Sequence, residues 1–242
     1  MDLLRARTWI NLYYDIQMRK LCLAAFAVVA VLLCGCGSKD APPKETPKAV
    51  SEAPPVPADA RPTIACFGDS LTAGQGLDNG QSYPDVLQRQ LDRRGYHYRV
   101  ANFGVSGDTT QDGLGRLPMV LAEKPAIVVL EFGANDGLRG QPVAIAESNL
   151  SQMIEQFQSA GTQVILAGIT LPPNYGPAYI QRFDAMYTSL ATKYRLKRIP
   201  FLLAGVAGDS RFMQKDGLHP NAEGARIVAD TVARSLEALL QK

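Results

Sequence analysis

The run AIVVLEF, residues 126–132, is the most hydrophobic stretch of the chain beyond residue 62. It predicts a central strand buried on both faces, as the strands of parallel sheets usually are. Four other apolar runs predict further strands of the same sheet: Thr63–Phe67, Arg99–Phe103, Gln163–Ile169 and Ile199–Leu203.

Amphipathic stretches that predict helices separate these strands. Ser82 is placed to cap the first helix, with Asp85 three residues later and one apolar face as far as about Arg94. Strands that alternate with helices indicate an α/β domain with a parallel sheet and right-handed crossovers, here over residues 63–242. The other expected segments are helices over Thr110–Glu123 (interrupted near Pro118), Val143–Ala160, Ala178–Tyr194 and Ala222–Leu240, and a loop over Leu171–Gly176.

Composition and charge are those of an ordinary globular domain behind an unusual N-terminus. Hydrophobic residues make up 46% of the 242 and charged residues 20%. The first 62 residues hold 8 of the 25 basic and 6 of the 23 acidic residues, which leaves 17 of each in the remainder. A formally neutral domain gives no support for nucleic-acid binding, which needs a clustered basic surface.

The N-terminus reads as a targeting segment. Met18-Arg19-Lys20 and the thirteen-residue apolar run Leu21–Leu33 form a signal peptide that is too short to span a bilayer comfortably. The ending Leu33-Cys34-Gly35-Cys36 resembles a bacterial lipobox. We therefore expect a lipoprotein signal over residues 18–35, a lipidated Cys36 and an upstream extension over residues 1–17. The alternative is an ordinary secretory signal that releases a soluble periplasmic protein.

Residues 36–62 predict a disordered tether between this anchor and the domain. Seven prolines lie between Gly37 and Pro62, with little that could build a core. A polyproline-like chain of this length reaches roughly 80 Å, at about 3.1 Å per residue. The expected location is the periplasm-facing side of a bacterial envelope membrane.

Cys66 is the only cysteine of the domain and lies inside the first predicted strand. It has no partner for an internal disulfide and no neighbour for a CxxC zinc site. We expect it to be a small buried apolar residue.

Polar clusters follow the predicted strands at the points where a ligand crevice forms. In such sheets the crevice lies beyond the carboxyl ends of the strands. The clusters are Gly68–Ser70 after the first strand, Gly104–Thr109 after the second, Gly133–Asp136 after the third, and Asp216–His219 before the last helix. We expect these four segments to converge on one edge of the sheet.

The chain has two histidines, and one of them fits the role of a catalytic base. His97 precedes the second strand on its amino side, away from the predicted crevice. His219 lies three residues after Asp216, which can orient the imidazole towards Ser70. A serine hydroxyl needs such a base to become a nucleophile.

A tetrahedral intermediate on Ser70 also needs hydrogen-bond donors. The candidates are the backbone amides of Ser70 and Gly107 and the side-chain amide of Asn135. Gly107 is suitable because a residue without Cβ lets the backbone approach a substrate closely. The alternative for Asn135 is an ordinary turn residue, since Asn-Asp-Gly favours turns.

Four blocks of sequence resemble the SGNH, or GDSL, hydrolase family. The family's four named positions correspond to Ser70, Gly107, Asn135 and His219, with Asp216 as the acid of the triad. The closest subgroup is the bacterial multifunctional thioesterase I, arylesterase and lysophospholipase proteins, which LPPNYG at 171–176 and GLRG at 137–140 also match. The blocks are FGDSLTAGQG (67–76), NFGVSGDTTQDGLGRLP (102–118), LEFGANDGLRG (130–140) and DGLHPNAEG (216–224).

The resemblance implies a three-layer, flavodoxin-like α/β/α sandwich with strand order 2-1-3-4-5. It implies a hydrolase of small-molecule or lipid acyl esters and thioesters that acts through a Ser-His-Asp triad and an acyl-enzyme, without a cofactor. We expect a monomer, and we expect no metal because the two histidines lie far apart in the sequence. Leu138, Pro173 and Tyr175 would then border the groove for the acyl chain.

Several other classes fit the sequence less well. Ser70 does not lie in the G-x-S-x-G of ordinary α/β-hydrolases, and no P-loop motif is present. Asp69, Asp108 and Asp136 could be taken for a metal cluster, but loop stabilisation is the favoured role. Two alternatives stay open: a carbohydrate O-deacetylase of the same family, and a non-catalytic envelope-binding lipoprotein.

Overall fold

The computed structural model describes residues 59–242. The predicted signal peptide, the predicted lipidation site Cys36 and nearly all of the predicted tether lie outside these residues.

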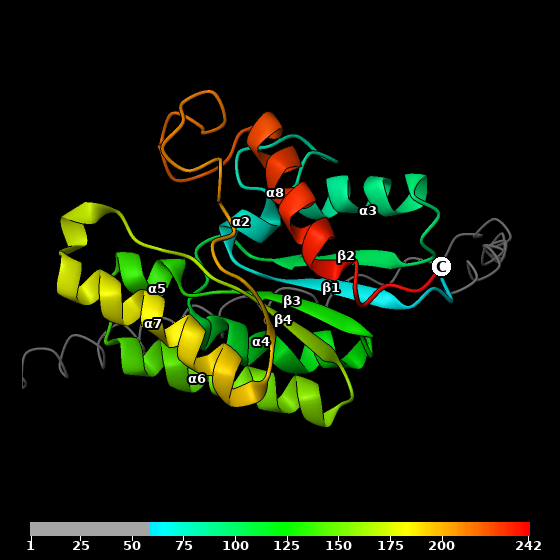
Figure 1. The fold of residues 1–242 in the computed structure, drawn as a ribbon, viewed down its shortest axis with the longest axis horizontal. Coiled ribbons are helices and arrows are strands. Elements are labelled where there is room, and N and C mark those ends of the chain that lie inside the picture. Colours follow the sequence, from blue (N-terminus) through cyan, green and yellow to red (C-terminus); the bar gives the residue numbers. More distant parts are fainter. Residues whose placement is uncertain (1–58) are drawn as a thin grey trace, which may run out of the picture. The chain divides into compact units, whose positions relative to one another are not determined.

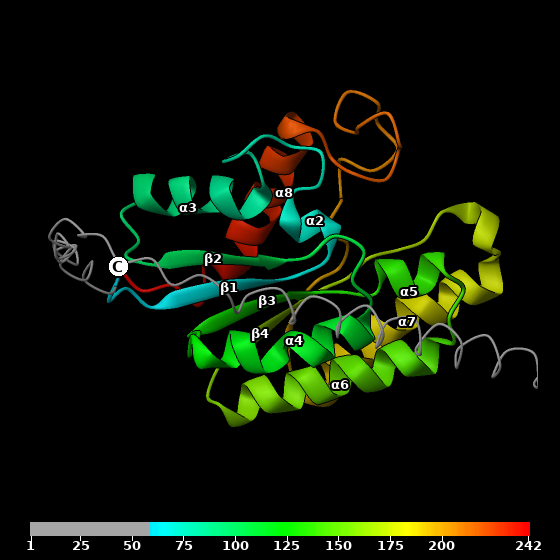
Figure 2. The same ribbon diagram turned by 180° about the vertical axis from the view of Figure 1, so that it is seen from behind.

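The core of the fold is one parallel sheet of five strands (Figures 1 and 2). The strand order is β2-β1-β3-β4-β5, which confirms the predicted topology. The chain runs outwards from β1 to β2 and then returns to place β3 on the other side of β1. The strands are β1 (Thr63–Gly68), β2 (Arg99–Gly104), β3 (Ile127–Glu131), β4 (Gln163–Ala167) and β5 (Lys197–Ile199).

β3 is buried along its whole length, as its hydrophobic sequence predicts. It pairs with β1 so that Phe67 lies beside Leu130 and Gly68 beside Glu131. The two central strands therefore end at the same level. The segments that follow them start side by side, at the switch point of the topology where α/β sheets bind ligands.

Helices cover both faces of the sheet and make three layers. Figure 1 shows α3 and α8 on one side of the sheet and α4, α6 and α7 on the other. The same grouping appears in the packing, since α3 contacts α8, and α6 contacts both α4 and α7. The helices are α3 (Tyr83–Arg93), α4 (Thr110–Ala122), α6 (Val143–Ser159), α7 (Pro177–Tyr194) and α8 (Ala222–Leu236).

Helix α3 begins where its sequence predicts. The Ser82 side chain caps the helix by accepting from the amide of Asp85. The apolar face predicted for this helix is buried, including Leu87 and Leu91, which are fully enclosed. Each such leucine contributes roughly 1.5–3 kcal/mol by leaving water. The helix is thus fixed against the sheet largely by its apolar stripe.

The predicted interruption of the next helix at Pro118 is wrong. Helix α4 runs without a break from Thr110 to Ala122, with Pro118 inside it. Pro118 lies on the exposed face. Water can therefore satisfy the backbone carbonyl one turn earlier, which has lost its amide partner, and the helix continues.

Other boundaries also differ from the prediction. β4 ends at Ala167, two residues before the predicted Ile169. β5 spans Lys197–Ile199 and shares only Ile199 with the predicted strand Ile199–Leu203, because Pro200 has no amide to continue the ladder. The last helix ends at Leu236 and not at Leu240. Leu239 and Leu240 still pack against the core, although they are not helical.

Three short helical segments were not predicted: α2 (Ser70–Ala73), α5 (Ala134–Leu138) and the 3-10 turn Pro173–Tyr175. The first two follow β1 and β3 and carry residues of the predicted site. Within residues 59–242, no helix is both long enough and apolar enough to cross a bilayer.

Candidate active site

Ser70 is the first residue of α2, directly beyond the carboxyl end of β1. The preceding Asp69 caps this short helix, since its Oδ1 accepts from the amide of Leu71 at 3.0 Å. The Ser70 side chain is nearly enclosed, with 9% of the residue exposed. The serine is therefore held at the end of a core strand with little freedom to move.

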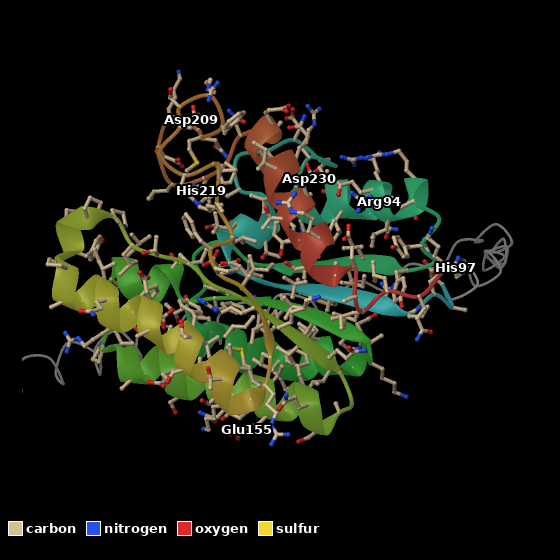
Figure 3. The ribbon with its side chains drawn as sticks, viewed as in Figure 1. Arg94, His97, Glu155, Asp209, His219 and Asp230 are labelled. Atoms are coloured by element: carbon tan, nitrogen blue, oxygen red, sulfur yellow. The ribbon has the colours of Figure 1, made fainter. Side chains whose placement is uncertain are left out.

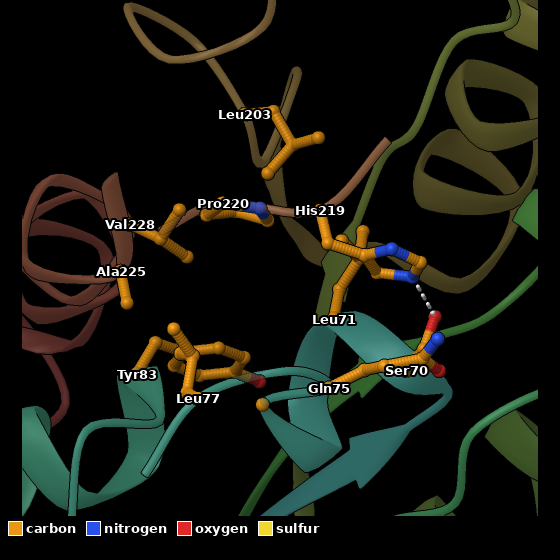
Figure 4. A pocket seen from close by; sticks show the side chains of 11 residues that line it. Ser70, Leu71, Gln75, Leu77, Tyr83, Leu203, His219, Pro220, Ala225 and Val228 are labelled. Carbon is orange, nitrogen blue, oxygen red and sulfur yellow. Dashed lines mark hydrogen bonds between the residues drawn. The ribbon is translucent and has the colours of Figure 1, made fainter. Parts of the chain in front are cut away.

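His219 connects Ser70 to Asp216. Its Nε2 lies 2.9 Å from Ser70 Oγ, and its Nδ1 lies 2.6 Å from Asp216 Oδ2. Figure 4 shows the first of these bonds, with apolar side chains such as Leu203 and Pro220 near the imidazole. Three predicted residues from distant parts of the chain thus meet in one hydrogen-bonded line.

The charge of Asp216 fixes the tautomer of the imidazole. Burial works to raise the pKa of Asp216, but hydrogen bonds from the side chain and backbone of His219 and from the amide of Leu218 lower it to about 2. An ionised carboxylate can only accept, so Nδ1 carries the proton. The lone pair of Nε2 then faces the Ser70 hydroxyl and can take its proton.

The loop that carries Asp216 and His219 is braced by its own hydrogen bonds. The amide of Gln214 donates to the carbonyl of His219 at 2.8 Å. The side-chain amide of Gln214 donates to the carbonyl of Pro220 at 2.9 Å and to that of Gln75 at 2.7 Å. The hydrogen bond to the Gln75 carbonyl connects the loop to the segment that follows α2.

The three predicted oxyanion donors also lie at this edge. Within residues 59–242, the backbone amides of Ser70 and Gly107 donate no hydrogen bond, so both are free to bind a ligand. Asn135, in α5, donates through Nδ2 to the Asp108 carbonyl at 2.9 Å and to Asp69 Oδ2 at 3.3 Å. The longer of these contacts is the weaker, so an oxyanion can replace it.

The other aspartates of the motif blocks hold the loops of this edge together. Asp136 accepts from the amide of Thr110 at 2.9 Å and from its hydroxyl at 2.6 Å. Asp108 pairs with Arg116 at 2.6 Å. In the described part of the chain, no group of three or more His, Cys, Asp or Glu side chains could hold a metal ion.

A mostly apolar groove of about 530 Å³ opens from Ser70 and His219. Of the three residues predicted to border it, Leu138 and Pro173 line it and Tyr175 does not. The Tyr175 hydroxyl instead donates to the carbonyl of Leu138 at 2.8 Å, so it connects the Pro173–Tyr175 turn to the end of α5. The other apolar lining residues are Leu71, Ala134, Ile169, Leu171, Pro172, Phe201, Leu203, Ala207, Met213 and Leu218.

His97 lies away from this site. It is exposed and precedes β2 at the amino end of the sheet. Figure 3 shows it at the opposite end of the sheet from His219.

Glu131, the last residue of β3, is a buried acid that the motif analysis missed. It is fully enclosed, and its Oε2 accepts from the amide of Asp69 at 3.2 Å. Burial, and after it the negative charge of Asp69, raises the pKa of Glu131 well above its usual range. Burial also raises the pKa of Asp69, to about 6. The available sequence signal was an acidic residue inside an otherwise apolar central strand.

The fold and this site define an acyl hydrolase, and the family comparison agrees. Residues 66–227 match the GDSL-like lipase/acylhydrolase family, and the chain belongs to this family. The resemblance to this family predicted from the motif blocks is confirmed, and the chain is a hydrolase of carboxylic esters or thioesters.

Named relatives support the same class. The chain is 44% identical over 182 residues to "Esterase TesA" of Pseudomonas aeruginosa, a match that covers 75% of this chain and 90% of the relative. It is 36% identical to "Thioesterase 1/protease 1/lysophospholipase L1" of Escherichia coli K12, covering 76% and 87%. The crystal structure of TesA superposes with a TM-score of 0.71 at 45% identity, covering 74% of this chain and 99% of that one.

Proposed function

We propose that this chain hydrolyses acyl esters and acyl thioesters through an acyl-enzyme on Ser70, with His219 as the base and Asp216 as the acid that orients it. The observation that carries this proposal is the line of contacts Ser70 Oγ–His219 Nε2 at 2.9 Å and His219 Nδ1–Asp216 Oδ2 at 2.6 Å. Ser70 and His219 line an apolar groove, and such a groove suits a substrate with an acyl chain.

The acylation step follows from this geometry. Ser70 Oγ attacks the carbonyl carbon of the ester while Nε2 of His219 takes the hydroxyl proton. The carbonyl oxygen becomes an oxyanion that accepts from the amides of Ser70 and Gly107 and from Nδ2 of Asn135. The intermediate collapses, the bond to the leaving group breaks, and the imidazolium gives its proton to the departing alkoxide or thiolate.

Deacylation repeats these steps with water in place of the serine. A water molecule gives one proton to Nε2 of His219 and attacks the acyl-enzyme carbonyl, and the same three donors hold the second oxyanion. The acyl–Ser70 bond then breaks, the proton returns to Oγ, and a carboxylic acid leaves. Each cycle consumes one water molecule and restores the enzyme.

Replacement of the proposed nucleophile tests this function. We expect Ser70→Ala to lower kcat/KM for a p-nitrophenyl ester by at least about 10³-fold, because the reaction loses its covalent step. The variant should also lose labelling by a fluorophosphonate, which mass spectrometry can locate on Ser70 of the parent protein. Ser189→Ala, an exposed serine of α7, is the matched control and should keep full activity. Retention of a tenth or more of the activity in Ser70→Ala would contradict the assignment.

We also propose that the protein is a lipoprotein anchored through Cys36, which rests on the sequence of residues 18–36 alone. Stable anchoring needs more than one acyl chain, which a lipidated N-terminal cysteine supplies. We expect Cys36→Ser to abolish incorporation of radiolabelled palmitate in a bacterial host and to move the protein out of the membrane fraction. Cys34→Ser is the matched control and should keep the label. Equal labelling of both variants would contradict the proposal.

A further inference from the structure

Glu131 lies directly under the turn that carries Ser70. It stands opposite Gly68 in the pairing of β1 with β3, and no part of it is exposed to solvent. A Cβ on Gly68 would collide with the Glu131 carboxyl and with the Thr72 hydroxyl. The sequence thus leaves room for an acid at the one place where β1 turns into α2.

The Glu131 carboxyl contacts both ends of that turn through one oxygen. Its Oε2 accepts from the amide of Asp69 at 3.2 Å and from the hydroxyl of Thr72 at 2.8 Å. These two residues lie immediately before Ser70 and two positions after it. The Thr72 hydroxyl is itself 3.2 Å from the hydroxyl of Tyr83, which anchors the contact to α3.

Asp69 carries this support to a second oxyanion donor. Its Oδ1 accepts from Leu71 at 3.0 Å, and its Oδ2 accepts from Nδ2 of Asn135 at 3.3 Å. The amide of Asp69 therefore donates to Glu131, while the side chain of Asp69 holds Asn135 at the site until an oxyanion takes the place of that contact. Two of the three donors proposed for the oxyanion depend on the same buried acid.

The groups around Glu131 offer its charge no counter-ion. The titratable groups that face it are Asp69 beyond β1, Tyr83 of α3 and Tyr187 of α7. The nearby cation of α4, Arg116, is engaged by Asp108 and by the Gly68 carbonyl. Glu131 Oε1 has no hydrogen-bond partner anywhere in residues 59–242. An ionised carboxylate would leave that oxygen charged and unpaired, so the protonated acid is the stable form.

We propose that Glu131 is a positioning residue, an uncharged acid that holds the Asp69–Leu71 turn so that the Ser70 amide and the Asn135 side chain point at the same oxyanion. The inference rests on the proposed function, since it assumes that Ser70 is the nucleophile. An uncharged acceptor suits this place, because a second buried negative charge beside Asp69 would oppose the charge that develops on the substrate oxygen.

The test compares two replacements of Glu131 in the full chain. Glu131→Gln keeps an uncharged oxygen that accepts from Asp69 and Thr72, and it puts an amide nitrogen where the acid holds its hydroxyl. We expect kcat for a p-nitrophenyl ester within about 3-fold of the parent and an unchanged pH profile of kcat. Glu131→Leu removes the acceptor, and we expect kcat to fall about 10- to 100-fold with KM within about 2-fold.

Binding of a trifluoromethyl ketone separates positioning from a general loss of structure. This inhibitor forms a hemiketal oxyanion on the serine, so its affinity should fall in Glu131→Leu by the same factor as kcat and should stay unchanged in Glu131→Gln. If Glu131→Leu does not fold, Thr72→Val provides the test, because it removes the hydroxyl that donates to Glu131. We expect this variant to lose 3- to 10-fold in kcat at unchanged KM.

Four results would overturn the inference. Three of them are an equal loss of kcat in the glutamine and leucine variants, a shifted pH profile in the glutamine variant, and a loss confined to KM. The fourth is an unchanged kcat in Glu131→Leu, or in Thr72→Val if Glu131→Leu does not fold. None of these touches the proposed function, which fails only if Ser70→Ala stays active.

Discussion

At His219 the two ring nitrogens have different partners, and Asp216 decides which nitrogen carries the proton. The carboxylate accepts at Nδ1 and leaves Nε2 free to act on Ser70. Ser70, Asp216 and His219 could be predicted from the sequence, because each lies in a short motif with a recognisable chemistry. Glu131 could not, because its partners Asp69 and Thr72 lie 62 and 59 positions away along the chain.

Replacement of Asp216 tests whether this carboxylate decides which ring nitrogen of His219 carries the proton. An amide at position 216 can donate to Nδ1, which favours the tautomer with its proton facing Ser70. We expect Asp216→Asn to lower kcat by on the order of 10³-fold or more, with little change in KM. Asp209→Asn changes an acid of the same loop whose side chain, within residues 59–242, pairs only with Arg211, and it is the matched control. Equal activity in the two variants would contradict the proposed role of Asp216.

The raised pKa of Asp69 predicts a pH dependence of stability. Its pKa of about 6, raised by burial, exceeds the ordinary value of 3.8. The folded chain therefore holds this proton more tightly than the unfolded chain, and the resulting stabilisation is lost as the pH rises from about 4 to about 6. Asp69→Asn cannot titrate, so its free energy of unfolding should rise relative to the parent over this range, by at most roughly 3 kcal/mol.

Urea unfolding at pH 4, 5, 6 and 7 measures this difference. Asp78→Asn, an exposed aspartate in a turn, is the control and should run parallel to the parent. Only the slope against pH is diagnostic, because the exchange also changes the helix cap by a constant amount. A difference between Asp69→Asn and the parent that stays flat across the range would contradict the prediction.

At the scale of elements, the long helices could be predicted from local patterns and the strand order from the family resemblance, whereas the short segments could not be predicted. Helix α3 has an apolar stripe and a cap that can be read locally. In contrast, α2 and α5 have four and five residues, which is too few for any periodic pattern. Tertiary contacts hold them, such as the bond from Asn135 to Asp69. Ser70 and Asn135 lie in these short elements, so the geometry of the site could not be predicted from the sequence.

The cap of α3 should affect the free energy of unfolding but not the catalytic activity. The Ser82 side chain accepts from the amide of Asp85 in the first turn of the helix, so its loss leaves a partly buried amide without a partner. We expect Ser82→Ala to lower the free energy of unfolding by about 1 kcal/mol with kcat unchanged. Ser189→Ala, in the interior of α7, should change stability by less than about 0.5 kcal/mol. Chemical denaturation of both variants gives the comparison, and equal losses would contradict the role of the cap.

At the scale of the whole domain, the groove is assembled from loops that follow β3, β4 and β5. Leu138, Leu171 and Phe201 follow these three strands in turn, and all three line the groove. No single motif contains the groove, and the apolar character appears only when these loops converge. The volume of about 530 Å³ is large enough for a chain of several methylene groups.

The groove predicts a preference for longer acyl chains. Each methylene buried there contributes about 0.8 kcal/mol, or roughly a 4-fold gain in kcat/KM. We expect kcat/KM to rise from acetyl to hexanoyl p-nitrophenyl esters, and Leu138→Ser to reduce the gain for hexanoyl without affecting acetyl. Ile145→Ser changes an exposed residue of α6 outside the groove and serves as the control. A flat series in the parent, with acetyl as good as hexanoyl, would favour a deacetylase.

The loop braced by Gln214 has a consequence for heat resistance. Asp216 and His219 lie on this loop, whereas Ser70 is fixed to the centre of the sheet. A few hydrogen bonds hold the loop, so it opens at lower free energy than the strands do. We expect activity to disappear at a lower temperature than the far-ultraviolet signal, and to return on cooling as long as the sheet has not melted. Thermal inactivation of this enzyme would then begin as a reversible separation of the base from the nucleophile.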